Sequence, residues 1–384
     1  MKRQFAALLT ALSLLPTLAL AQEYYTLPEI KEQAKDGWHE TYTDKYGRET
    51  AVDIDVDVYG NDKAPVLRLE DANLQVDETR LVDGETADHI RDKFKRFNIT
   101  KDYPYDTVTE VRKKGGRKTW IYRAWGEAID PNKAYGAEYG SDLTIGGVYD
   151  FCAQALARQG LDMSDDFEYA HPKQVEMLVN ISQATGQPAS TPFYIVNLWQ
   201  KLRGLPILEH AMKGFEKQGW PMYTPTVIFM MLDENSYDIY INMMKEAELV
   251  AEDIPLCSFD TVKRNLEAQI EAGHIQGVLS LRFGYALYNE PGYPNYRKDI
   301  EIDYQADYYA VPSWVIECIY MPNGKKTFVM QEDPTPGANI RGQNDCRTLV
   351  INAQNGELID VTDRSKGGFG DADYKGFIPW DRVK

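Results

Sequence analysis

The most regular alternation of residues between two faces occurs in the segment Ile275-Gln-Gly-Val-Leu-Ser-Leu-Arg-Phe-Gly-Tyr-Ala-Leu287. Alternation of this kind is typical of a β-strand with one buried face. Polar residues, among them Gln276, Ser280 and Arg282, occupy positions between the apolar ones. We expect a long core strand whose buried face holds Ile275, Gly277, Leu279, Leu281, Phe283, Tyr285 and Leu287.

A helix is predicted directly before this strand. Ser258 is a suitable N-cap, and Gly273 is a suitable stop. Between them, Val262, Leu266 and Ile270 recur with helical spacing and form one apolar stripe. The helix is therefore expected to lie across the sheet to which the strand belongs.

Further strands follow from the same alternation, at 194–202, 227–232, 237–241, 314–320 and 346–353. Because the helices are segregated from these strands, the pattern indicates an α+β fold. Its antiparallel sheets are expected to carry their helices on one face.

The N-terminal half contains both kinds of element. Thr26 to Glu29 forms a capping box that predicts a helix, and Val52 to Val58 alternates with aspartates as a strand does. The other expected elements are helices at 85–97, 148–158 and 172–184, a hairpin around 113–118 and a long loop at 130–147. A linker at 186–191 divides the chain into domains at 22–186 and 187–384, with a flexible tail from about residue 365.

Residues 1–21 have the three parts of a secretory signal peptide. Lys2 and Arg3 precede a predominantly apolar run, which ends in a small-x-small site formed by Ala19 and Ala21. The run is short for a membrane span, which needs about 20 apolar residues. We expect cleavage after Ala21, an extracellular or cell-envelope location and no later membrane span; an uncleaved anchor is the alternative.

Charge and cysteine content narrow the classes of function. The net charge is −17, and loss of Lys2 and Arg3 with the signal peptide makes it −19. Such a surface repels phosphate backbones, so nucleic acid is not an expected partner. Four cysteines in an exported chain allow three pairings. We favour Cys318 with Cys346, since both lie on strands that are expected to be neighbours.

The sequence contains no motif of an established catalytic or metal site. Gly-x-Ser-x-Gly, HExxH and P-loop patterns are missing, and no two of the five histidines stand four residues apart. Asp53, Asp55 and Asp57 alternate on a strand, where same-face carboxylates lie about 7 Å apart, too far to share one calcium ion. No cofactor is therefore expected. Paired carboxylates of a glycoside hydrolase stay possible, because acids are abundant.

Three features occur together between about residues 190 and 365. They are the residues Gln200, Gly204 and Pro206, the helix and strand at 258–285, and the closing turn from Asn352 to Gly356. Together they resemble the PepSY and thermolysin-propeptide type of extracellular domain. The order of these segments is also similar to that of YycI-type ectodomains, which restrain cell-wall sensor kinases. Those proteins keep a membrane anchor, whereas release is expected here. The N-terminal half has Trp38, Thr41-Tyr42 and Tyr46-Gly-Arg48 ahead of the strand with alternating aspartates, and it resembles uncharacterised secreted proteins of gut Firmicutes.

The resemblance implies two or more PepSY- or cystatin-like modules. It also implies a secreted, non-catalytic protein of the bacterial cell envelope that engages protein or peptide and modulates a protease or a sensor. Strand addition along a sheet edge is the expected mode of binding. The alternative is a carbohydrate-binding protein or an unrecognised glycoside hydrolase, and the oligomeric state is left open.

Overall fold

The computed structural model describes residues 23–80, 109–112, 118–125, 130–169, 175–182, 185, 192–208, 226–233, 235–289, 308–320 and 346–359. Several predictions fall outside these residues: the signal peptide with Ala19 and Ala21, the helix at 85–97, the linker at 186–191 and the tail. They stay predictions.

The described chain forms a 14-stranded sheet and a separate two-stranded sheet. In the first half of the chain the strands are β1 (Trp38–Thr43), β2 (Glu49–Ile54), β3 (Val56–Val58), β4 (Val66–Arg80), β5 (Thr109–Arg112), β6 (Lys118–Trp125), β7 (Phe167–Tyr169) and β8 (Val175–Ser182). In the second half they are β9 (Phe193–Leu202), β10 (Leu205–Pro206), β11 (Thr226–Asp233), β12 (Ser236–Ala251), β13 (Ile275–Asn289), β14 (Tyr308–Tyr320), β15 (Cys346–Asn352) and β16 (Leu358–Ile359).

The helices are α2 (Leu27–Ala34), α4 (Ile145–Ala157), α5 (Phe259–Glu271) and the short 3₁₀ helix η2 (Ala137–Tyr139). Pairing is antiparallel throughout, apart from β3 with β13 and a single parallel bridge between Ile207 and Tyr285. The predicted α+β class is confirmed. None of the described helices has the length and apolar content that crossing a membrane requires.

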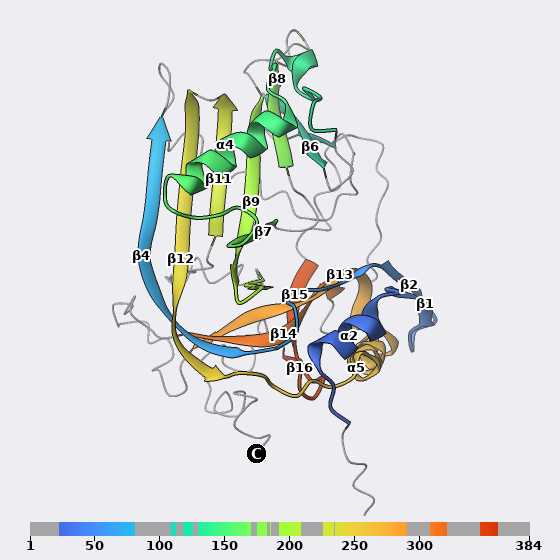
Figure 1. Ribbon diagram of the computed structural model, residues 1–384. Helices are drawn as coiled ribbons and strands as arrows, with labels where there is room; N and C mark the ends of the chain where they lie inside the picture. The colour runs from blue at the N-terminus through green and yellow to red at the C-terminus, as the bar shows by residue number, and fades with distance from the viewer. Residues whose placement is uncertain are drawn as a thin grey trace, which may run out of the picture.

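Two long strands carry the large sheet around a bend. β4 pairs with β12 from Val66 to Arg80, and its first residues also pair with β14. Figure 1 shows β4 curving from one part of the sheet to the other. The strand path is β16-β15-β14-β4-β12-β11-β9-β8-β6-β5, and β13 adds to the other edge of β14. The bend gives the sheet two helix-covered regions.

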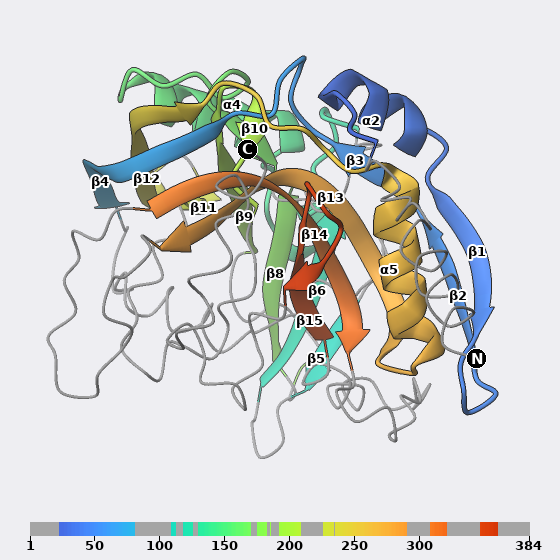
Figure 2. The same cartoon turned by 90° about the horizontal axis from the view of Figure 1, so that it is seen from below.

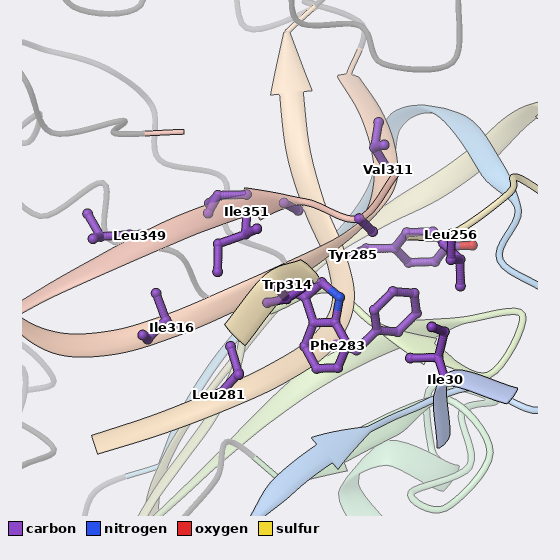
Figure 3. Packing of buried hydrophobic residues seen from close by; sticks show 14 of the residues in the cluster. Ile30, Leu256, Leu281, Phe283, Tyr285, Val311, Trp314, Ile316, Leu349 and Ile351 are labelled. Atoms are coloured by element: carbon purple, nitrogen blue, oxygen red, sulfur yellow. The ribbon is translucent and has the colours of Figure 1, made fainter. Parts of the chain in front are cut away.

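The first region is the α5 core, in which α2 and α5 cover β13, β14 and β15 (Figure 2). The Ser258 side chain caps α5 by accepting a hydrogen bond from the Thr261 N–H at 3.1 Å, as predicted. At the centre Trp314 lies beside Phe283 (Figure 3). The centroid of its ring is 5.3 Å from that of Phe283 and 5.4 Å from that of Phe259. The apolar stripe of the helix therefore meets the apolar face of the strands.

The second region is the α4 core, in which α4 crosses β9, β11 and β12 (Figure 1). The Thr144 hydroxyl caps α4 by accepting from the Gly147 N–H at 3.0 Å. Because the helix begins at Ile145, the predicted loop at 130–147 ends slightly earlier than expected. Helices thus pack on antiparallel strands in both regions, as the sequence predicts.

The predicted domain boundary at 186/187 does not separate these two cores. The α5 core combines residues from Leu27 to Leu69 with residues from Leu205 to Ala353. The α4 core runs from Ile145 to Met243 and includes both sides of the boundary. In the α5 core the reason is the pairing of β4 with β12 and β14, which joins segments more than 150 positions apart and leaves no local sequence signal. In the α4 core the reason is the pairing of β7 and β8 with β9.

Three predicted elements differ from the structure. Residues 175–182 form the strand β8, not a helix, and Val175, Met177 and Val179 are buried at alternate positions. The strand predicted at 52–58 divides at Asp55, so that β2 pairs with β1 and β3 pairs with β13. In β13 a bulge between Val278 and Ser280 shifts the alternation. Leu279 is therefore exposed and Val278 buried.

The turn between β1 and β2 depends on a buried carboxylate. Asp44 Oδ1 accepts hydrogen bonds from the N–H groups of Tyr46 and Arg48 at 2.8 and 2.9 Å. Asp44 Oδ2 accepts from Arg48 Nε at 2.6 Å. Burial opposes ionisation, but the contacts from Arg48 and Tyr46 outweigh it and lower the pKa of Asp44.

We predict that Asp44→Asn lowers the free energy of unfolding at neutral pH, and that this difference from the unmodified protein disappears in acid. A lowered folded-state pKa adds stability above the unfolded pKa of about 3.9, and this stability disappears as the pH falls through the folded pKa. Urea unfolding of the variant and of the unmodified protein, from pH 7 down to about pH 2, checks the direction of this pH dependence. A difference that stays constant across this range contradicts the prediction.

Candidate functional site

The turn residues that suggested the resemblance have structural roles. Gln200 is buried, its Nε2 donates to Met244 O at 2.6 Å and its Oε1 accepts from the Met244 N–H at 2.9 Å. This amide side chain thus satisfies the backbone of β12 at a bulge between Asn242 and Met244. Gly204 has φ +82° and, with Arg203 at φ +52°, forms the two-residue turn before Pro206. Positive φ at both positions matches the twist of a hairpin.

The closing turn is also confirmed. Gly356 has φ +73°, and its N–H donates to Asn352 O at 2.7 Å. Asn265 on α5 donates from Nδ2 to Gly356 O at 2.6 Å, which fixes the turn against the helix. These residues position the sheet and the helix; none of them lines the groove described below.

The predicted disulfide between Cys318 and Cys346 is wrong. In the register of β14 with β15, Cys318 lies opposite Arg347, and Cys346 lies opposite Ile319. Successive residues of a strand alternate between faces, so an offset of one position is incompatible with a bridge. Cys318 is a buried thiol.

An open groove of about 700 Å³ lies between the C-terminal end of α4, the loop that follows it, β7 and the end of β9. Figure 1 places β7 beside the end of β9, on the side that α4 covers. Its lining residues are Ala153, Gln154, Ala157, Leu161, Asp162, Met163, Ser164, Phe167, Glu168, Tyr169, Leu198 and Lys201. The floor is mainly apolar, and the charged groups are few.

β7 presents one backbone edge that is not used by β9. The Lys201 N–H donates to Asp166 O at 2.7 Å, so residues 166 and 201 form a hydrogen-bonded pair. Because such pairs alternate along an antiparallel ladder, Glu168 is the next bonded residue. Phe167 and Tyr169 therefore direct their N–H and C=O groups away from β9, where the Tyr169 N–H donates to Glu168 Oε1 at 3.2 Å. Within the described part of the chain, β7 pairs with β9 alone.

Aromatic and charged groups define the rim of the groove. The ring of Tyr169 lies 5.6 Å from that of Tyr149, and burial raises the pKa of both hydroxyls, for Tyr149 to about 12. Hydrogen bonds from the Ser164 hydroxyl and from the Asp165 and Ser164 N–H groups lower the pKa of Asp162. The charge of Lys201, whose Nζ donates to Ser164 O, adds to this lowering. At neutral pH both tyrosine hydroxyls are therefore protonated, and the Asp162 carboxyl is ionised.

A second polar cluster is buried between the two regions of the sheet. Arg282 Nη2 lies 2.8 Å from Glu317 Oε2 and 2.7 Å from Ser280 Oγ, while Ser280 Oγ donates to Glu317 Oε2 at 2.9 Å. The Arg282 guanidinium also lies 5.1 Å from the Trp199 ring of β9. Arg282 and Glu317 are almost fully buried, so this cluster joins β13 and β14 to β9 but offers no surface for a ligand.

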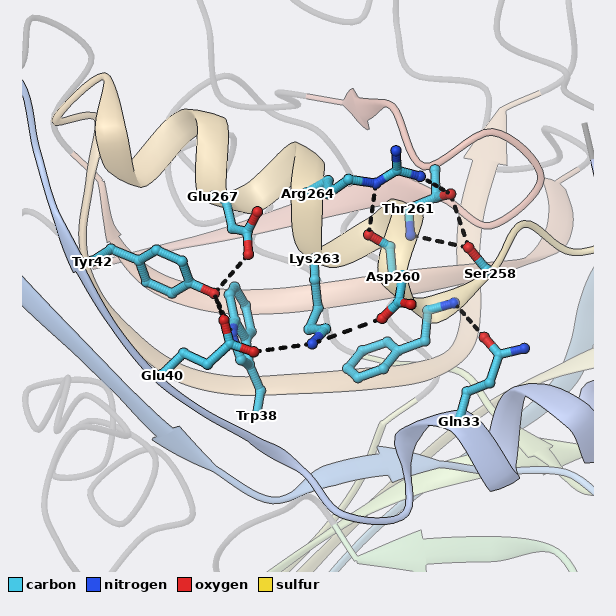
Figure 4. A network of polar contacts seen from close by, with 11 residues as sticks. Gln33, Trp38, Glu40, Tyr42, Ser258, Asp260, Thr261, Lys263, Arg264 and Glu267 are labelled. Atoms are coloured by element: carbon cyan, nitrogen blue, oxygen red, sulfur yellow. Dashed lines mark hydrogen bonds and ion pairs between the residues drawn. The ribbon is translucent and has the colours of Figure 1, made fainter. Parts of the chain in front are cut away.

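A pair of carboxylates meets at Tyr42 (Figure 4). Its hydroxyl lies 2.6 Å from Glu40 Oε2 and 2.8 Å from Glu267 Oε1, and it accepts from Trp38 Nε1 at 2.9 Å. Burial, and next the contact with Glu40, raises the pKa of this hydroxyl, so it stays protonated. Because Tyr42 fills the space between the two acids, they hold β1 against α5 and leave no room for a glycosidic bond between them.

Asp53 and Asp55 belong to no group of three potential metal ligands within the described residues. Asp53 Oδ1 lies 2.6 Å from His39 Nδ1, and this contact raises the pKa of the histidine. Among the described residues, no three His, Cys, Asp or Glu side chains lie close enough to hold one metal ion.

Sequence reasoning missed the residues of the groove. β7 has only three residues, too few for alternation to be visible, and it follows a loop rich in aspartate. Because a helix was predicted at 172–184, the strand β8 within this range was not predicted. The available signal was the alternation of Val175, Met177 and Val179, which fits a period of two.

No family model and no curated protein matches this chain. Among solved structures, a similar one is the crystal structure of an uncharacterised protein from Eubacterium rectale. It is 10% identical, with a TM-score of 0.43, and the match covers 88% of this chain and 98% of the other.

Proposed function

We propose that this protein is a secreted, non-catalytic binding protein of the cell envelope that holds an extended polypeptide segment in the groove beside β7. The observation that carries the proposal is the combination of an apolar groove with an adjacent backbone edge at Phe167 and Tyr169. An added strand pairs its backbone with such an edge, and alternate side chains enter the groove. Modulation of an envelope protease or sensor is the role that such binding serves.

The groove favours a strand over a compact ligand. A three-residue edge satisfies few hydrogen bonds, so apolar side chains of the ligand must supply much of the free energy of binding, at about 25 cal/mol per Å² of buried apolar surface. Ala153 and Ala157 of α4 are small and leave room above β7 for those side chains. A peptide that alternates apolar and polar residues fits both features.

We predict that Ala157→Trp lowers peptide affinity at least about tenfold, because the indole fills the groove and removes more than about 1.4 kcal/mol of contacts. The measurement is enrichment from a random dodecapeptide display library, followed by titration of the selected peptides. Gln159→Trp is the matched control, since Gln159 is exposed and does not line the groove.

The control is expected to bind the selected peptides as the unmodified protein does. Equal binding by Ala157→Trp and Gln159→Trp contradicts the assignment of the groove. A library that yields no binders, when a glycan array does, contradicts the proposed class of ligand.

A further inference from the structure

On the basis of the proposed function, we infer that the bound strand carries a lysine or arginine directly opposite Glu168, flanked by two apolar residues that enter the groove. The geometry of β7 supports this pattern. Phe167 and Tyr169 pack on the α4 core, while Glu168 lies between them and is in register with Trp199. Because neighbouring residues alternate between faces, a strand paired with β7 has the same alternation.

The local charges favour a cation at the central position. Residues 145–169 contain five acids and one base, Arg158. The acids are Asp150, Asp162, Asp165, Asp166 and Glu168. Lys201, which also lines the groove, is already engaged with Ser164 O and lies near Asp162. Of these acids, Asp162 and Glu168 line the groove.

Of the two acids that line the groove, Glu168 is the one that belongs to β7, the strand with which the added strand pairs. Its Oε1 accepts from the Tyr169 N–H at 3.2 Å. Within the described residues no lysine or arginine forms an ion pair with it. Directly opposed side chains of an antiparallel pair lie about 5 Å apart, so opposite charges attract there and like charges repel.

Three peptides test the inference: acetyl-TVTVXVTVT-amide with X as lysine, threonine or glutamate. Each is titrated into the unmodified protein while its NMR spectrum is recorded. We expect the lysine peptide to bind about tenfold more tightly than the glutamate peptide, with the threonine peptide between them. The difference is expected to shrink in high salt, because exposed charges are screened.

A charge-swapped variant gives the sharper test. Glu168→Lys is expected to reverse the order, and the milder Glu168→Gln is expected to abolish it. Asp165→Lys changes the net charge by the same amount, but Asp165 is exposed and does not line the groove. This control is expected to keep the original order. Circular dichroism of each variant confirms that it is folded.

The outcomes separate the two proposals. If all three peptides bind equally and Ala157→Trp abolishes their binding, the proposed function stands and the cationic preference is wrong. If the order survives in Glu168→Lys, the preference arises elsewhere and the inference is again wrong. If no peptide binds even at millimolar concentration, both proposals fail.

Discussion

Arg282→Met is expected to lower the free energy of unfolding by about 3–5 kcal/mol, because it removes the Arg282 cation from beside the buried Glu317 carboxylate. Arg282 makes close contacts with Glu317 and Ser280 in a region with almost no exposure to water. Ser280 supplies one hydrogen bond to the carboxylate but no charge. Urea denaturation measures the loss.

The double variant Arg282→Met/Glu317→Met separates charge from packing. Replacing both members of a buried pair by apolar residues is often neutral or stabilising, so we expect the double variant to recover most of the lost stability. The explanation is contradicted if the double variant loses as much stability as the two single variants together. It is also contradicted if Arg282→Met alone costs less than about 1 kcal/mol. If Arg282→Met does not fold, Glu317→Gln can be measured in its place, because it removes the charge and keeps the shape of the side chain.

Trp314→Ala is expected to cost about 3–5 kcal/mol, because it removes the largest apolar side chain at the centre of the α5 core. Trp314 is buried between Phe259 of α5 and Phe283 of β13, with ring centroids 5.4 and 5.3 Å away. The cavity would therefore open where helix and sheet meet. Thermal and urea unfolding both report the effect.

Leu279→Ala is the matched control for this truncation. The residue lies on β13, beside β14, but the bulge leaves it 38% exposed. We expect a cost within about 0.5 kcal/mol, as for surface substitutions. A cost near that of Leu281→Ala, which removes a fully buried side chain and is expected to lose about 2–5 kcal/mol, would place Leu279 in the core and contradict the bulge.

The sequence predicts the α5 core well because its signals are local. Ser258 and Gly273 mark the ends of α5, and the alternation after Ile275 identifies β13. Gly204 and Gly356 mark turns that need positive φ. Each of these features depends on residues close in the chain, so its physical cause can be read from the sequence.

Other features depend on distant partners and escape such reasoning. The bulge at Val278 and Ser280 changes which residues of β13 are buried, and it is visible only in the register with β14. The pairing of β4 with β12 merges the two predicted domains. Gln200 resembles a family motif, yet its role, bonding the backbone of Met244, requires knowledge of a strand more than 40 residues away.

The candidate groove belongs to this second class. Its residues come from α4, from the loop after it, from β7 and from β9, and no single segment carries a recognisable pattern. Strand addition was expected from the family resemblance, but the sequence did not indicate which edge is available. The pairing of β7 with β9 supplies that edge, through the direction of the Phe167 and Tyr169 backbone groups.

The most direct test of strand addition is amide hydrogen exchange at β7, resolved residue by residue by NMR with and without the bound lysine peptide. We expect exchange of the Phe167 amide to slow at least about tenfold on binding, since its N–H then pairs with the added strand. The amide of Val262, within α5, is expected not to change. Binding that leaves Phe167 unchanged, or that protects a different strand instead, would contradict the central claim.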